Sequence, residues 1–118
     1  MNHNTELGRR GEQLAAEHLE GAGMTVVDRN WRCALGEVDL VARAGATLVF
    51  VEVKTRSGAG YGHPFESITP RKLARLRRLA AAWCDETGAR ADLIRIDAVS
   101  VLAPPSGAVV IEHLEGVC

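Results

Sequence analysis

The segment GEVDLVARAGATLVFVEVKTR, residues 36–56, contains two apolar runs separated by a glycine. Valine, leucine and phenylalanine dominate both runs, as is typical of β-strands, and Gly45 marks the natural turn between them. We therefore expect two paired strands at about 37–43 and 47–55. Three acids and a lysine stand among these apolar residues: Glu37, Asp39, Glu52 and Lys54.

The register of this hairpin decides whether the charged side chains meet. Side chains alternate between faces along a strand, so Glu37 and Asp39 share one face of their strand, and Glu52 and Lys54 share one face of theirs. A two-residue turn at Gly45–Ala46 places Asp39 opposite Glu52, and Glu37 opposite Lys54. A slip of one residue would turn Glu52 and Lys54 to the other face of the sheet.

Two carboxylates held opposite each other on a sheet repel, so a cation or a metal ion is needed to compensate. Carboxylate oxygens are hard ligands that suit Mg²⁺ or Mn²⁺. Lys54 follows Glu52 by two residues, where it can orient and stabilise an attacking water or hydroxide. This combination suits metal-assisted hydrolysis of a phosphodiester. The alternative is a cross-strand salt-bridge network of Glu37, Lys54 and Arg56 on a solvated face, because the Asp-x(12)-Glu-x-Lys pattern is loose.

A third acid lies in the first predicted helix, over residues 5–23. Its apolar residues recur at helical spacing, and Gly21 and Gly23 mark its end. Glu12 lies at the edge of this apolar stripe, so a helix packed on the sheet can bring Glu12 towards Asp39 and Glu52. The alternative for Glu12 is an ordinary solvated glutamate.

The other segments complete an alternating pattern of strands and helices. They are a short strand at 24–27, a polar passage at 28–33, a loop at 56–69, a helix from Pro70 to about Glu86, and strands at 92–102 and 108–114. The order α-β-β-β-α-β-β predicts an α/β fold with a central mixed sheet flanked by helices. A chain of 118 residues can bury one core and is too short for two, so we expect a single domain over 1–118.

Charge is balanced overall but uneven along the chain. The net charge of −1 gives no general argument for nucleic acid, yet basic residues gather between Lys54 and Arg78, where Glu66 is the one acid. In the second helix, Arg71, Arg75 and Arg78 are spaced to line an outward face. This face suits phosphate contacts, and a solvated helix face is the alternative.

Composition and the remaining motifs exclude several classes of protein. No apolar run approaches the roughly 20 residues of a membrane span, and the polar beginning of the chain lacks a signal-peptide core, so we expect a cytoplasmic protein. Aromatic residues make up only 4% of the chain, which disfavours recognition by base stacking. Neither the cysteines nor the histidines are spaced as a metal site, which predicts reduced thiols and solvated histidines: Cys33, Cys84, Cys118, His3, His18, His63 and His113.

Short blocks of residues along almost the whole chain carry a family resemblance. They are Gly8 with Gly11-Glu12, Asn30 and Arg32, the GEVDL run at 36–40, the VEVK run at 51–54 with Arg56, and Gly62, Pro64 and Glu66 ahead of Lys72. In these blocks the chain resembles the YraN family of small bacterial proteins. That family is similar in turn to the restriction-endonuclease-like superfamily, and most of all to archaeal-type Holliday-junction resolvases.

The resemblance implies a restriction-endonuclease-like fold and a metal-dependent endonuclease acting on structured or branched DNA. It implies Mg²⁺ or Mn²⁺ ligation by Asp39 and Glu52, assisted by Glu12, with catalysis by Asp39, Glu52 and Lys54 and with Glu37 as an additional acid. Phosphate contacts would then come from the basic segment: Arg56, Arg71, Lys72, Arg75 and Arg78. Resolvases present two sites as a dimer, so a homodimer is an open expectation. The alternative is a non-catalytic module that binds nucleic acid or a partner and retains the nuclease fold.

Overall fold

The computed structural model of the chain describes residues 3–58 and 63–117. Its elements are α1 (His3–Gly21), β1 (Thr25–Cys33), β2 (Gly36–Ala44), β3 (Thr47–Arg56), the short 3₁₀ helix η1 (Pro64–Ser67), α2 (Pro70–Thr87), β4 (Leu93–Leu102) and β5 (Val110–Leu114). The predicted order of helices and strands, α-β-β-β-α-β-β, is therefore confirmed, with η1 as an addition inside the predicted loop.

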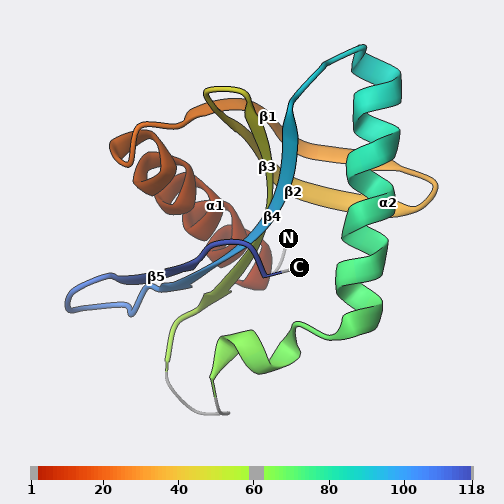
Figure 1. Ribbon diagram of the computed structural model, residues 1–118. Coiled ribbons are helices and arrows are strands. Elements are labelled where there is room, and N and C mark those ends of the chain that lie inside the picture. The colour runs from red at the N-terminus through yellow and green to blue at the C-terminus, as the bar shows by residue number, and fades with distance from the viewer. Residues whose placement is uncertain (1–2, 59–62, 118) are drawn as a thin grey trace.

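The five strands form one sheet in the order β1-β2-β3-β4-β5. Neighbouring strands are antiparallel except β3 and β4, which are parallel. A parallel pair needs a crossover connection, and α2 supplies it. The two helices lie on opposite sides of the sheet, α1 on one face and α2 on the other (Figure 1). The predicted α/β fold with a central mixed sheet is therefore confirmed.

Each face of the sheet has its own hydrophobic core, and β3 contributes to both. Val49 and Val51 pack with α1, whereas Leu48 and Phe50 pack with α2. This explains why the run at 48–51 is apolar at every position, since a strand covered on both faces loses the polar alternation of a half-exposed one. The buried residues of the two helices are Ala15, Ala16 and Leu19 in α1, and Leu76, Leu79, Ala80 and Trp83 in α2.

The polar passage at 28–33 belongs to β1, so the prediction of a strand ending at residue 27 is wrong. The strand stays paired with β2 as far as Cys33↔Gly36. Two indole hydrogen bonds join this polar part of β1 to α2: Trp83 Nε1 donates to Asp28 Oδ2 at 2.8 Å, and Trp31 Nε1 donates to Glu86 Oε2 at 2.7 Å. Asp28 and Trp31 are thus satisfied by a helix that is distant in the sequence.

The β2–β3 hairpin has the predicted register. Its ladder runs from Ala44↔Thr47 to Leu40↔Val51, across a two-residue turn at Gly45–Ala46. Gly45 has a φ of 61°, a left-handed conformation that glycine adopts without steric cost. Glu37, Asp39, Glu52 and Lys54 are therefore carried beyond the end of the ladder that is away from the turn.

Candidate functional site

The β2–β3 ladder ends at Leu40↔Val51, although both strands continue. β2 remains paired with β1 to Gly36, and β3 remains paired with β4 through Arg56. The two strands therefore separate, and we call the gap between residues 36–39 and 52–56 the fork. At its base the Val53 backbone N–H donates to Asp39 Oδ2 at 2.8 Å, so the Asp39 side chain satisfies a β3 amide beyond the end of the ladder.

The separation of the strands changes one predicted pair. Glu37 does not lie opposite Lys54 in a ladder, because β2 has left β3 before that position. Instead, Glu37 Oε2 accepts a hydrogen bond at 2.9 Å from Arg32 Nε on β1. The expected Glu37–Lys54 pairing is therefore wrong, and the same break stops the ladder one position short of Asp39 and Glu52.

A cavity of about 350 Å³ occupies the fork, and three elements line it. Asp39, Glu52 and Lys54 all contribute to its wall. Lys54 therefore lines the same cavity as the two acids, which its predicted role in hydrolysis requires. The other lining residues are Gly36 and Glu37 of β2, Val53 of β3, and Lys72, Arg75 and Leu76 of α2.

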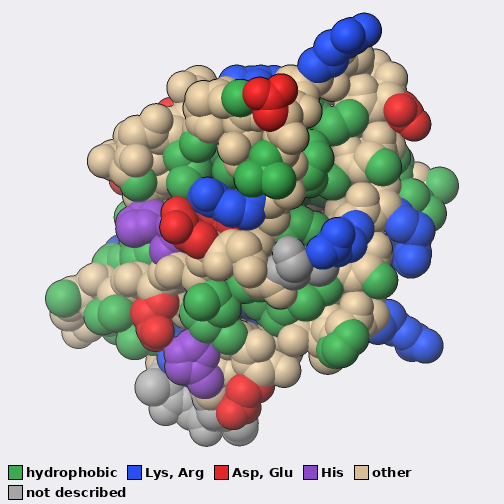
Figure 2. All heavy atoms as spheres, viewed as in Figure 1, with side chains coloured by type: hydrophobic (Ala, Val, Ile, Leu, Met, Phe, Trp, Pro, Cys, Tyr) green, Lys and Arg blue, Asp and Glu red, His purple; other side chains and the backbone are tan. Residues whose placement is uncertain are grey.

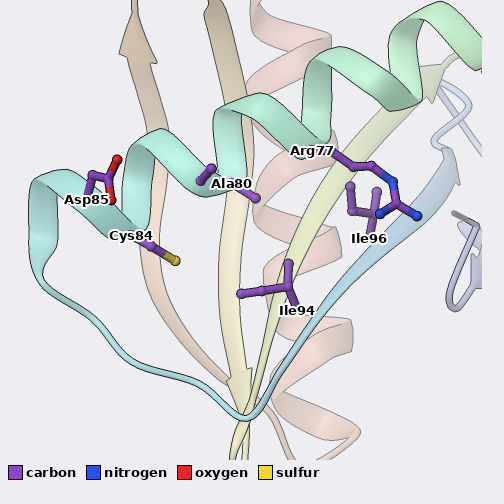
Figure 3. Close-up of a pocket in the computed structure, with 7 residues that line it drawn as sticks. Arg77, Ala80, Cys84, Asp85, Ile94 and Ile96 are labelled. Atoms are coloured by element: carbon purple, nitrogen blue, oxygen red, sulfur yellow. The ribbon is translucent and has the colours of Figure 1, made fainter.

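A larger cavity of about 450 Å³ lies between α2 and β4 and has a different character (Figure 3). Ala80, Ile94 and Ile96 line it, with Arg77 and Asp85 farther apart along the helix. Its lining has one acid, so it has no group of carboxylates to hold a cation. The acids and the lysine singled out in the hairpin therefore line the smaller cavity in the fork and not this one.

The electrostatics of the fork are dominated by its acids. Burial, followed by the Glu52 charge, raises the pKa of Asp39 to about 7, against the opposing hydrogen bond from Val53. Glu12 and Glu37 raise the Asp39 pKa further. Four acids thus act on one another here, and the Asp39 carboxyl is uncharged for part of the time at neutral pH. A cation in the fork would relieve this repulsion.

Glu12 approaches the fork from the α1 side of the sheet. The residue before it, Gly11, is in such close contact with β3 that a Cβ there would overlap the Thr55 side chain. Burial raises the pKa of Glu12, and a hydrogen bond from Asn30 opposes this increase. Glu12 is not part of the cavity wall. Its carboxylate oxygens do not form a set with those of Asp39 and Glu52 in which all lie within 4.8 Å of one another.

The basic residues predicted to contact phosphate fall into two groups. Lys72 and Arg75 line the fork cavity, and Lys72 Nζ lies 2.8 Å from Glu52 Oε2. Arg71 and Arg78 are exposed on α2, where basic side chains follow the helix on the face drawn in Figure 2. Arg56 is half-buried and lines a neighbouring cavity of about 410 Å³ that also reaches Lys54.

The prediction of solvated histidines is wrong for His18 and His113. His113 Nε2 lies 2.8 Å from Asp97 Oδ2, and its Nδ1 lies 3.3 Å from His18 Nε2. Asp97 is fully buried and also accepts hydrogen bonds from Arg95 and the Gly116 amide. The sequence contains one sign of this cluster, because Asp97 is the one charged residue in the apolar run at 96–101.

Two smaller expectations concern cysteines and membranes. Cys33 and Cys84 are free thiols, as predicted, and Cys118 lies outside the described residues. Neither α1 nor α2, in the part of the chain that the structure describes, is long and apolar enough to cross a bilayer.

Comparison with known proteins shows the family to which the chain belongs. The model of the uncharacterised protein family UPF0102 matches residues 11–101, a range that includes Glu12, the whole hairpin and α2. A UPF0102 protein of Beutenbergia cavernae is 56% identical over 117 residues, which cover 99% of each chain. Relatives from Clavibacter michiganensis and Streptomyces coelicolor are 51% and 54% identical, over 100% and 99% of this chain and 100% and 92% of theirs. The chain therefore belongs to the UPF0102 family.

Proposed function

We propose that the protein is a metal-dependent endonuclease that hydrolyses a phosphodiester of structured or branched DNA. The observation that carries this proposal is the group of acids at the fork, where burial and the Glu52 charge raise the Asp39 pKa to about 7 beside Lys54. An acid with a strongly shifted pKa in an open cavity is a typical feature of a functional site. The arrangement of acids and lysine supports membership of the restriction-endonuclease-like superfamily.

The residues of the fork fit a hard divalent cation. Asp39 and Glu52 offer carboxylate oxygens, the donors that Mg²⁺ and Mn²⁺ prefer, and their mutual repulsion would fall when a cation binds. When bound, the ion would supply a Lewis acid for the phosphoryl oxygen and neutralise the charge that develops there. Glu12 would act on Asp39 through its charge from the other side of the sheet.

The basic side chains have separate tasks in this proposal. Lys54, in the wall of the cavity, orients the attacking water and stabilises its negative form. Arg75, in the same wall, binds a non-bridging oxygen of the scissile phosphate. Arg71 and Arg78, exposed on α2, contact neighbouring phosphates without reading the sequence. A homodimer would present two such forks to two strands.

One contact favours a second candidate function. Lys72 already holds Glu52 at 2.8 Å, so a positive charge of the protein itself compensates one of the two acids. A fork stabilised in this way suits a non-catalytic module that binds nucleic acid through α2 and retains the nuclease fold. The two functions differ in whether binding leads to a broken phosphodiester.

A cleavage assay separates the two functions. The substrates are an end-labelled four-way junction and a linear duplex of the same sequence, each with Mg²⁺ and with Mn²⁺. We expect the protein to nick the junction, and Glu52→Gln and Lys54→Met to slow cleavage by at least about 100-fold. The control is Glu20→Gln, an exposed acid at the end of α1, which should cleave like the unmodified protein.

Two other outcomes decide against the proposal. Salt-dependent binding to the junction without cleavage in either metal supports the non-catalytic module. No salt-dependent binding to either DNA contradicts both functions. Unfolding curves of each variant show whether a loss of cleavage reflects a loss of fold.

A further inference from the structure

A second group of ligating side chains lies outside the wall of the fork cavity, where the end of α1 meets β4 and β5. His18 is in the last turn of α1, Asp97 is on β4 and His113 is on β5. In Figure 2, histidine, acidic and basic side chains lie next to one another on the β5 side of the molecule. Three segments distant in the sequence therefore converge on one position.

Asp97 cannot readily take a new ligand, because both of its oxygens already accept hydrogen bonds. Oδ1 accepts from Arg95 Nε at 2.9 Å and from the Gly116 amide at 3.0 Å. Oδ2 accepts from a second Arg95 nitrogen at 3.0 Å and lies 2.8 Å from His113 Nε2. Asp97, His113 and Glu115 have ligating atoms within 4.8 Å of one another, but a cation among them would have to displace Arg95 from Asp97.

The hydrogen bond to Asp97 determines which nitrogen of His113 is open. Burial raises the pKa of Asp97, but the hydrogen bonds from Arg95, Gly116 and His113 outweigh it and keep the pKa below its usual range. Asp97 is therefore an anion, and it fixes the His113 proton on Nε2. This leaves a lone pair on Nδ1, the nitrogen that faces His18. Carboxylates orient metal-binding histidines in proteins in the same way.

The spacing of the two imidazoles is that of a chelating pair. His18 Nε2 lies 3.3 Å from His113 Nδ1, and the ring planes are inclined at 74°. Two nitrogens bound at about 2.0–2.1 Å to one tetrahedral Zn²⁺ are about 3.3–3.4 Å apart.

We propose that His18 Nε2 and His113 Nδ1 together bind a divalent transition-metal ion such as Zn²⁺ or Co²⁺, with Asp97 holding His113 in position. Imidazole nitrogens favour these ions over Mg²⁺, whereas carboxylates of the kind in the fork favour Mg²⁺ and Mn²⁺. The protein therefore has two cation sites with different preferences. The imidazole site joins α1 to β5 and does not depend on the function proposed for the fork.

The test is a Co²⁺ and Zn²⁺ titration of untagged, chelator-treated protein. It uses a His3→Gln background, so that the histidine near the beginning of the chain does not contribute. We expect one Co²⁺ per chain with visible absorption from nitrogen ligation, displacement by Zn²⁺, and a higher melting temperature with Zn²⁺. His18→Gln and His113→Gln should each weaken binding by at least about tenfold, a typical cost of losing a ligand or its orientation.

Two control variants define the site. His63→Gln removes an exposed histidine that contacts Glu112 and should bind Co²⁺ unchanged. Asp39→Asn removes an acid of the fork and should also bind it unchanged, which distinguishes the two sites. Because His113 contacts buried Asp97, His18→Gln is the decisive variant if His113→Gln fails to fold. Equal binding by His18→Gln and His63→Gln, or no binding by the parent protein, contradicts the proposal and leaves a His18–His113 hydrogen bond.

Discussion

Two aspartates of this sheet have opposite electrostatic behaviour, although burial raises the pKa of both. Around Asp39, the neighbours that act next are the acids Glu52, Glu12 and Glu37, and the pKa rises to about 7. Around Asp97, the neighbours are Arg95, His113 and the Gly116 amide, and the pKa falls. The sign of the pKa shift therefore depends on the charges of the neighbouring groups. The ionised form of Asp97 stabilises the fold, whereas the ionised form of Asp39 destabilises it.

The largest expected effect is the loss of Asp97. In Asp97→Ala, the Arg95 guanidinium, His113 Nε2 and the Gly116 amide lose their common acceptor. Breaking a buried ion pair from one side costs about 3–5 kcal/mol, and we expect the lower end because Arg95 is partly exposed. Urea unfolding at pH 7 measures the loss. Asp92→Ala, at an exposed acid, is the control and should change stability by less than about 0.5 kcal/mol.

The second prediction concerns Asp39 and has the opposite sign. Its pKa is 3.8 in the reference state and about 7 in the fold, so between these values the native state holds a proton that the unfolded state has lost. Stability from this group therefore falls as pH rises from about 4 to 7, and the penalty is complete above pH 7. We expect Asp39→Asn to be more stable than the parent protein at pH 8, by about 2–4 kcal/mol at about 1.4 kcal/mol per pKa unit.

Unfolding curves of the parent protein and Asp39→Asn at pH 4, 6 and 8 measure this effect. The two proteins should differ least at pH 4, where Asp39 is protonated in the fold and still partly protonated in the unfolded chain. Asp97 provides the contrast, because its pKa is lowered in the fold: its contribution is present above the unfolded pKa and is lost as pH falls through the folded one. Equal stability of Asp39→Asn and the parent protein at pH 8 would contradict the difference between the two aspartates.

The third prediction uses two glycines of α1. Gly11→Ala places a methyl group against the Thr55 side chain, so α1 must shift away from β3. We expect a loss of about 1–3 kcal/mol from overpacking, and a lower Asp39 pKa because Glu12 moves with the helix. Gly8→Ala is a matched control, because the space around its Cβ is open. It should stabilise the helix by up to about 1 kcal/mol.

The smallest expected effect comes from the countercharge in the fork. Lys72→Met keeps the length of the side chain but removes the ion pair with Glu52. The uncompensated Glu52 charge should then raise the Asp39 pKa further, while stability at pH 7 falls by no more than about 1 kcal/mol, as for a partly exposed pair. The pH dependence of unfolding measures both changes. Arg78→Met, on the exposed part of α2, is the control and should leave the Asp39 pKa unchanged.

The parts of the fold that could be predicted are those set by local chemistry. A glycine turn and a period of two residues were enough to give the register of the hairpin, because both act within neighbouring residues. Thr69, whose side chain accepts from the Lys72 amide, and Pro70 after it gave the start of α2 for the same reason. The sequence therefore predicted the register that carries Asp39, Glu52 and Lys54 to one end of the hairpin.

Other features depended on contacts between distant segments and could not be predicted in this way. The fork exists because β2 follows β1 while β3 follows β4, a competition that no single strand encodes. The polar half of β1 is a strand because it pairs with β2, and two indole bonds join it to α2. Lys72 reaches Glu52 only after the crossover has placed α2 over the sheet. The His18–His113–Asp97 cluster combines residues from the two ends of the chain.

The Val53 amide, which closes the base of the fork, has a spectroscopic consequence. Its proton is donated to the Asp39 carboxyl group, so its chemical shift should titrate with the charge of that acid. The Gly116 amide is donated to Asp97 and should stay constant over the same pH range, because the pKa of that acid is lowered. Two peaks in an amide NMR spectrum would therefore report the charge states of the two aspartates separately, in the unmodified protein and without a substrate.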